Sequence, residues 1–119
     1  MKILCIDDEA DIVALMAEFL QLLGHSVVTA ENGRQGYDIL TAAPEDIDLV
    51  ISDVKMPEMG GFELLRLLRH QGHATPVVLV SGHNDGSVEL EALDHGGVAV
   101  LSKPFDLIRL QKVVEGMVA

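Results

Sequence analysis

Five short apolar runs recur along the chain at nearly even spacing, beginning at Lys2, His25, Asp48, Pro76 and Val98. Each run is too short for a helix and is rich in the β-branched residues typical of strands. Three runs are apolar almost throughout, as in parallel strands covered on both faces, whereas the more polar HSVVTA fits an edge strand. The pattern predicts a buried, mostly parallel sheet.

Segments of helical length, with apolar residues at helical intervals, lie between these runs. The first runs from Glu9 to Leu23 and stops at Gly24, a residue type that commonly ends helices. The later segments are Gly33–Leu40, Gly61–His70, Ser87–Asp94 and Leu107–Met117. Strand and helix alternate five times, which predicts an α/β fold with right-handed crossovers and five helices distributed over both faces of the sheet.

Composition restricts the class of protein. At 119 residues the chain has the length of one domain, expected to span 1–119, and 49% apolar with only 3% aromatic residues gives an aliphatic core. A net charge of −11 argues against direct binding to nucleic acid or a membrane. The single cysteine, Cys5, lies in an apolar run and reads as a buried reduced thiol. The N-terminus has no leader or membrane span, so a cytoplasmic location is expected.

Polar side chains stand where the predicted strands end. In open parallel sheets, ligands bind beyond the carboxyl ends of the strands, so these side chains are expected to converge. They are Asp7 and Asp8 after the first strand, Asp53 at the third, Ser81 at the fourth and Lys103 at the fifth. Carboxylates brought together repel one another unless a cation compensates them, and Mg²⁺, with Mn²⁺ as a substitute, suits an all-oxygen site.

Such a set can carry out phosphoryl transfer. Asp53 is the candidate nucleophile, because a carboxylate can form an aspartyl phosphate. Asp7 and Asp8 would hold the cation, while Lys103 and the Ser81 hydroxyl would stabilise charge on phosphoryl oxygens. Taken singly, each residue also has a structural interpretation: Asp8 as a helix N-cap, Asp53 and Ser81 as turn residues, and Lys103 as a solvated charge. The joint pattern at four strand ends favours a functional site.

Four stretches resemble the receiver domains of two-component response regulators, and the resemblance spans the whole chain. They are IDDE at 6–9, SDVKMPEMGGFE at 52–63, VSGH at 80–83 and LSKPF at 101–105. The resemblance implies the flavodoxin-like fold, with strand order 2-1-3-4-5. It also implies that Asp53 is phosphorylated by the phosphohistidine of a sensor histidine kinase or phosphotransfer protein.

The same resemblance implies a ligand set for the cation. Asp8 and Asp53 would bind Mg²⁺ directly, Asp7 through water, and the Lys55 backbone carbonyl would be a further ligand. The family commonly has a cis peptide bond at the position of Lys103–Pro104. Signalling would reach a downstream protein or fused output domain through helix 4, strand 5 and helix 5. The chain would then be a stand-alone regulator or the receiver of a longer protein, and not an enzyme with a separate substrate.

Three positions depart from the family pattern or vary within it. Val100 stands where receivers usually carry an aromatic residue that moves on phosphorylation, and Gly60 replaces a frequent Asp as an acceptable N-cap. Lys55 and His83 occupy variable positions that tune phosphate loss in the family, or are simply exposed loop residues. Two other functions remain open: an aspartate-nucleophile phosphatase, disfavoured because Lys55 replaces its usual second acid, and a pseudo-receiver that only binds proteins.

Overall fold

The computed structural model describes residues 1–43, 45–82, 96, 99–103 and 106–118. Its elements, in chain order, are β1 (Lys2–Ile6), α1 (Ala10–Leu22), β2 (Ser26–Ala30), α2 (Gly33–Ala42), β3 (Leu49–Asp53), α3 (Gly61–His70), β4 (Val77–Ser81), β5 (Ala99–Ser102) and α5 (Leu107–Val118). The predicted helix at Ser87–Asp94 lies outside the described residues, as do His83 and Pro104. The other predicted elements are confirmed with shifts of one or two residues at their ends.

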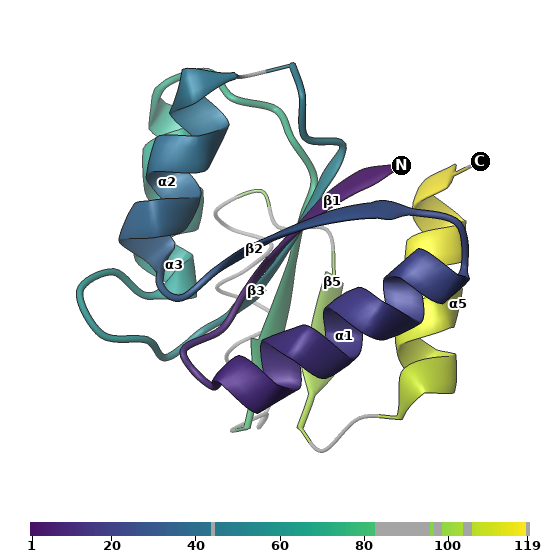
Figure 1. Ribbon diagram of the computed structural model, residues 1–119. Coiled ribbons are helices and arrows are strands. Elements are labelled where there is room, and N and C mark those ends of the chain that lie inside the picture. The colour runs from purple at the N-terminus through teal and green to yellow at the C-terminus, as the bar shows by residue number, and fades with distance from the viewer. Residues whose placement is uncertain (44, 83–95, 97–98, 104–105, 119) are drawn as a thin grey trace.

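Five parallel strands form one sheet in the order β2-β1-β3-β4-β5, as the resemblance implied. The register aligns the strand ends: Ile6 pairs with Ala30 and Ser52, and Ser81 pairs with Ser102. The carboxyl ends of all five strands therefore meet at one edge of the sheet, which places the residues that follow them side by side (Figure 1).

Helices cover both faces of the sheet among the described residues. In Figure 1, α1 and α5 lie together on one face, and α2 and α3 lie together on the other. Side chains alternate along β1, so Ile3 and Cys5 join the core beneath α1 and α5, whereas Leu4 and Ile6 join the core beneath α2 and α3. All four are completely buried, which explains why this strand is apolar on both faces.

The glycines that end or begin helices do so for different reasons. Gly24 follows α1 with a φ of +95°, a left-handed conformation that glycine adopts without strain. Gly60 is the N-cap of α3, as expected from the sequence. At Gly61 a Cβ atom would approach the Asp53 carbonyl oxygen to 2.5 Å. The absence of a side chain at this position therefore lets α3 pack directly against the end of β3.

The burial of Cys5 and the apolar character of the helices both bear on expectations from the sequence. Cys5 is fully buried in β1, and burial raises the pKa of its thiol to about 12, in line with the predicted inert thiol. Among the described residues, no helix is both long enough and apolar enough to span a lipid bilayer.

Candidate functional site

An acidic cluster lies at the carboxyl edge of the sheet. Asp7 follows β1, Asp8 is next to it, and Asp53 ends the neighbouring strand β3. One carboxylate oxygen from each lies within 4.8 Å of the other two. Asp7 and Asp53 are only 2% and 7% exposed, whereas Asp8 is exposed, so the cluster opens to solvent on one side. The predicted convergence of these acids is present in the fold.

Asp7 is held in place by backbone groups. Its N–H donates to the Ala30 carbonyl of β2 at 3.2 Å, and its Oδ1 accepts from the Glu9 N–H at 2.9 Å. Burial raises the pKa of Asp7; the Glu9 hydrogen bond opposes that effect and the negative charge of Asp53 adds to it. The ionised site therefore carries unfavourable charge that a cation would relieve.

Lys103 reaches into this cluster from the end of β5. Its Nζ lies 2.9 Å from Asp53 Oδ2, 3.7 Å from Asp7 Oδ2 and 4.0 Å from Glu9 Oε1. Its backbone N–H donates to the Ser81 carbonyl at 2.7 Å, which fixes the start of the side chain beside β4. Burial acts to lower the pKa of Lys103, but the hydrogen bond and charge of Asp53 outweigh it and raise that pKa.

Ser81 completes the set at the end of β4, where it is 4% exposed. It borders a cavity of about 400 Å³ together with residues from three other strand ends. The lining residues are Asp8, Glu9, Asp53, Val54, Lys55, Ser81, Gly82 and Lys103. Lys55 is exposed at the edge of this cavity. All the candidate site residues from the sequence therefore line the cavity except Asp7, which contacts Lys103 next to it. The role of the Lys55 carbonyl stays a prediction.

The structure rejects two of the structural interpretations. The N-cap of α1 is Glu9 and not Asp8, because the helix begins one residue later than a cap at Asp8 requires. Lys103 is not a solvated surface charge, since its side chain is 26% exposed and pairs with buried carboxylates. Asp8 instead lines the cavity beside Asp53.

The donor set suits a divalent cation. Three carboxylates converge within 4.8 Å, and Lys103 is the cation that the structure places against them. All-oxygen clusters of this kind favour Mg²⁺ over metals that prefer sulfur or imidazole. Asp7, Asp8 and Asp53 therefore fit the magnesium ion that the sequence predicts, and a cation would offset both the burial of the Asp7 carboxylate and its repulsion from Asp53.

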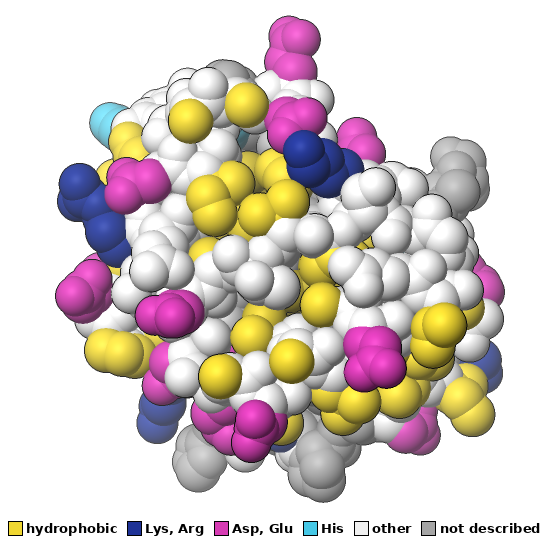
Figure 2. Space-filling view, in the orientation of Figure 1, with side chains coloured by type: hydrophobic (Ala, Val, Ile, Leu, Met, Phe, Trp, Pro, Cys, Tyr) yellow, Lys and Arg dark blue, Asp and Glu magenta, His cyan; other side chains and the backbone are white. Residues whose placement is uncertain are grey.

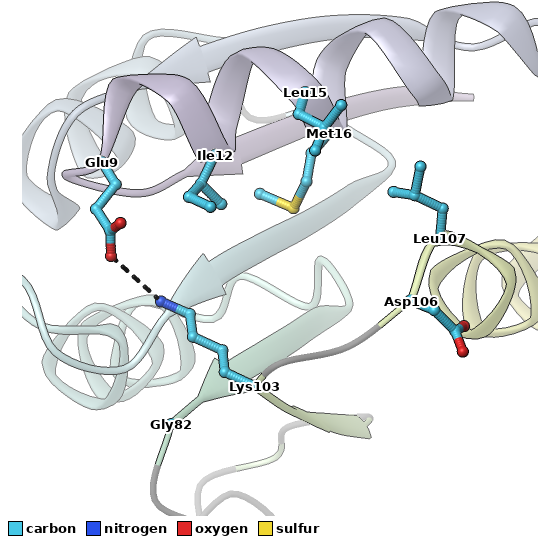
Figure 3. A pocket seen from close by; sticks show the side chains of 8 residues that line it. All are labelled: Glu9, Ile12, Leu15, Met16, Gly82, Lys103, Asp106 and Leu107. Carbon is cyan, nitrogen blue, oxygen red and sulfur yellow. Dashed lines mark ion pairs between the residues drawn. The ribbon is translucent and has the colours of Figure 1, made fainter.

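Sequence reasoning gave no role to Glu9, although it follows the two strand-end acids directly. In the structure its carboxylate faces Lys103 across the mouth of the site (Figure 3). Glu9, Gly82 and Lys103 also border a second cavity of about 560 Å³ that continues between α1 and the start of α5. The apolar lining of this groove comes from Ile12, Met16 and Leu107. Figure 2 shows that hydrophobic and acidic side chains are also interspersed over the face of the molecule in view.

Comparison with known proteins agrees with the fold and with the acidic cluster described above. The response regulator receiver domain family matches residues 3–115. The transcriptional regulatory protein CpxR of Escherichia coli is 35% identical over 88% of this chain, and the two-component response regulator ARR10 of Arabidopsis thaliana is 30% identical over 99%. The chain covers 44% and 21% of these proteins, so it spans less than half the length of either.

Solved structures match along nearly their whole length. The chemotaxis protein CheY4 of Vibrio cholerae has a TM-score of 0.89 and 31% identity, covering 98% of this chain and 97% of its own. The response regulator TrrA of Thermotoga maritima, solved in complex with Mg²⁺ and BeF, has a TM-score of 0.86 and 28% identity over the same shares. With its parallel sheet, its acidic cluster and its strand-end lysine, this chain belongs to the receiver domains of two-component response regulators.

Proposed function

We propose that Asp53 is the phosphoacceptor of this receiver and that residues 1–119 work as one signalling domain. The observation that carries the proposal is the contact between Lys103 Nζ and Asp53 Oδ2 at 2.9 Å, inside a cavity that the acidic cluster also borders. A nucleophilic carboxylate, a fixed ammonium and a set of cation ligands are the groups that phosphoryl transfer to an aspartate requires.

The step can be written for Asp53. One carboxylate oxygen attacks the phosphorus, the bond from phosphorus to the donor breaks, and the donor leaves with that electron pair; with a phosphohistidine donor the imidazole leaves. Lys103 then pairs with a phosphoryl oxygen in place of Asp53 Oδ2, and the Ser81 hydroxyl donates to another. The buried walls of the site limit the approach of water to Asp53, which is 7% exposed.

Asp7, Asp8 and Asp53 would hold Mg²⁺, with the Lys55 carbonyl and bound water as further ligands. When bound, the ion supplies positive charge that neutralises phosphoryl oxygens. Asp7 contributes by holding its charge at the bottom of the cluster, where the Glu9 N–H fixes its orientation. Mn²⁺ is expected to substitute for Mg²⁺ because it accepts the same oxygen ligands.

The partners follow from the family. Response regulators receive phosphoryl groups from histidine kinases, and CpxR is a transcriptional regulator. For this chain we propose a histidine kinase or phosphotransfer protein as donor, and a downstream protein or fused output domain that reads α5, β5 and the segment before it. That segment lies outside the described residues. Val100, which replaces the usual aromatic residue, packs against the core beneath α2 and α3. The cytoplasmic location stays a prediction.

The alternative of a phosphatase receives no specific support. Lys55 is exposed where such enzymes need a second acid, so no carboxyl group stands two residues after the nucleophile. We therefore expect the chain to catalyse only its own phosphorylation and dephosphorylation. Steady turnover of small phosphomonoesters would contradict this, and failure to bind Mg²⁺ or phosphate would instead favour a pseudo-receiver that only binds proteins.

A labelling experiment tests the proposal. The chain is incubated with Mg²⁺ and acetyl phosphate or a phosphorylated histidine kinase, and the products are resolved on Phos-tag gels and by mass spectrometry. We expect one added phosphoryl group, lost in Asp53→Asn and in the presence of EDTA. Asp46→Asn removes an exposed acid that pairs with Lys2, at the opposite end of β1 from Asp7 and Asp8, and serves as the matched control. Equal labelling of Asp53→Asn would remove Asp53 from the role.

A further inference from the structure

Glu9 occupies a distinct position at the mouth of the site. Its side chain is 63% exposed, yet its Oε1 lies 4.0 Å from Lys103 Nζ (Figure 3). It borders both the phosphoacceptor cavity and the apolar groove beside it. It does not belong to the converging set of cation ligands formed by Asp7, Asp8 and Asp53.

This placement fixes a negative charge beside the path of an incoming phosphoryl group. A phosphoryl oxygen that pairs with Lys103 at about 3 Å stands within about 7 Å of the Glu9 carboxylate, given the 4.0 Å ion pair. A charge at that distance repels a dianion more strongly than a monoanion. Lys103 also pairs with Asp53 at 2.9 Å and with Asp7 at 3.7 Å, so we expect it to keep its position without Glu9.

We propose that Glu9 is a specificity-determining residue that selects against small dianionic phosphodonors. The inference rests on the proposed function, because it concerns donors to Asp53. Glu9 raises the barrier to reaction with free acyl phosphates, because nothing compensates their negative charge. The reaction stays open to a phosphorylated protein whose surface offsets the negative charge of its phosphoryl group. The chain is thereby insulated from small phosphorylated metabolites.

Two donors of different charge isolate this effect. Acetyl phosphate is a dianion at neutral pH, and phosphoramidate is a monoanion. In each reaction an Asp53 oxygen bonds to phosphorus as the bond from phosphorus to the leaving group breaks. Acetyl phosphate releases acetate, which takes the electron pair of that bond. Phosphoramidate carries its proton on nitrogen before the transfer and releases ammonia with the electron pair. The same nucleophile, ammonium and metal ligands serve both reactions. The different leaving groups cancel when the rate of a variant is divided by the wild-type rate with the same donor, so this ratio reports the charge of the donor.

Single-turnover labelling rates are measured for wild type and Glu9→Gln at low ionic strength, with Mg²⁺ saturating for each variant as established by titration. We expect the rate with acetyl phosphate to rise about fivefold and that with phosphoramidate about twofold, because the Coulomb energy scales with donor charge. Both gains are expected to shrink at about 0.5 M salt, where the Debye length falls below the distance from Glu9 to the donor.

Glu18→Gln is the matched control. Glu18 is exposed on the same helix but borders neither cavity, so its loss makes the same change in net charge far from the site. We expect wild-type rates with both donors. Glu9→Asp keeps the charge and is expected to keep the discrimination between donors, even if its shorter side chain loses the contact with Lys103.

Three outcomes would overturn the inference. Glu9→Gln could match wild type with acetyl phosphate, it could speed both donors equally, or Glu18→Gln could give the same gain. Each would show that Glu9 does not act through the charge of the donor, while labelling of the wild-type chain leaves the proposed function standing. Absence of labelling in wild type at any donor concentration would overturn the proposed function and this inference together.

Discussion

Asp7 shows how a single buried carboxylate ties stability to the site. It is 2% exposed, its pKa is raised by burial, and it faces the charges of Asp53 and Lys103. Because the folded pKa lies above the ordinary value, ionised Asp7 costs stability at neutral pH, and that cost falls as the pH drops toward the ordinary pKa.

We expect Asp7→Asn to stabilise the metal-free chain by about 1 kcal/mol, or ~4 °C in melting temperature, because it removes a desolvated charge. Calorimetry in EDTA measures the shift. The gain is expected to diminish from pH 7 toward pH 4, and added Mg²⁺ is expected to stabilise the variant much less than wild type. A variant that melts below wild type and responds fully to Mg²⁺ would contradict this account.

Cys5 makes a second prediction at the scale of one residue. Its thiol is fully buried with a pKa near 12, against 9.0 for the ordinary value. A raised folded pKa means that stability is intact below pH 9 and is lost as the pH rises from 9 toward 12. Relative to Cys5→Ala, wild type is expected to lose about 1.4 kcal/mol between pH 7 and about pH 10. Urea unfolding at each pH measures it, and a parallel pH dependence of the two proteins would count against it.

Among the elements, two helical glycines have opposite surroundings. At Gly61, the first residue of α3, a Cβ would meet the Asp53 carbonyl oxygen at 2.5 Å and Leu79 at 2.9 Å. At Gly116, in α5, a Cβ would meet no described atom within 4 Å. The close packing of α3 on β3 therefore requires glycine at Gly61, whereas Gly116 is open to substitution.

Alanine at the two positions should change stability in opposite directions. We expect Gly61→Ala to lower the unfolding free energy by about 2 kcal/mol through overpacking, and to slow phosphorylation because it displaces the end of β3. Gly116→Ala is expected to raise it by about 0.7 kcal/mol, since alanine favours a helix. Chemical denaturation and acetyl phosphate labelling measure both effects. A neutral Gly61→Ala would show that α3 can shift without cost.

The elements were largely predictable because each follows from a local pattern. The short apolar run at Leu49–Asp53 is typical of a strand covered on both faces, and the strand is buried at every position. The order of the strands came from the resemblance, since periodicity says nothing about which strands pair. The contact between Glu9 and Lys103 was not predicted, because it depends on how the chain turns from β1 into α1 and on the reach of two long side chains. The N-cap of α1 was not predicted either, because the sequence does not decide whether the helix begins after Asp8 or after Glu9.

At the scale of the whole molecule, the charge of −11 affects every measurement of cation binding. Any salt screens repulsion within such a chain and so raises its stability somewhat. A specific site adds a further contribution that grows with ligand concentration and reaches about 2.7 kcal/mol at a hundredfold excess over the dissociation constant.

We therefore expect Mg²⁺ to raise the melting temperature more than NaCl does at equal ionic strength. The excess should disappear in Asp8→Ala, which removes an exposed carboxylate of the proposed ligand set without disturbing the core. It should persist in Asp46→Ala, which removes an exposed acid elsewhere. Differential scanning fluorimetry across a titration measures it. Identical curves for Mg²⁺ and NaCl would mean that the acidic cluster offers only diffuse attraction.

The assembly of the site from separate strand ends has a consequence for synthesis in the cell. Asp53 has been made long before Lys103 emerges, because β5 follows the other four strands in the chain and takes its place at the border of the sheet. A nascent chain that has not passed residue 103 thus holds its acids without their ammonium partner. On the proposed function, such a chain is not expected to accept a phosphoryl group, so Asp53 becomes competent only after β5 has been made.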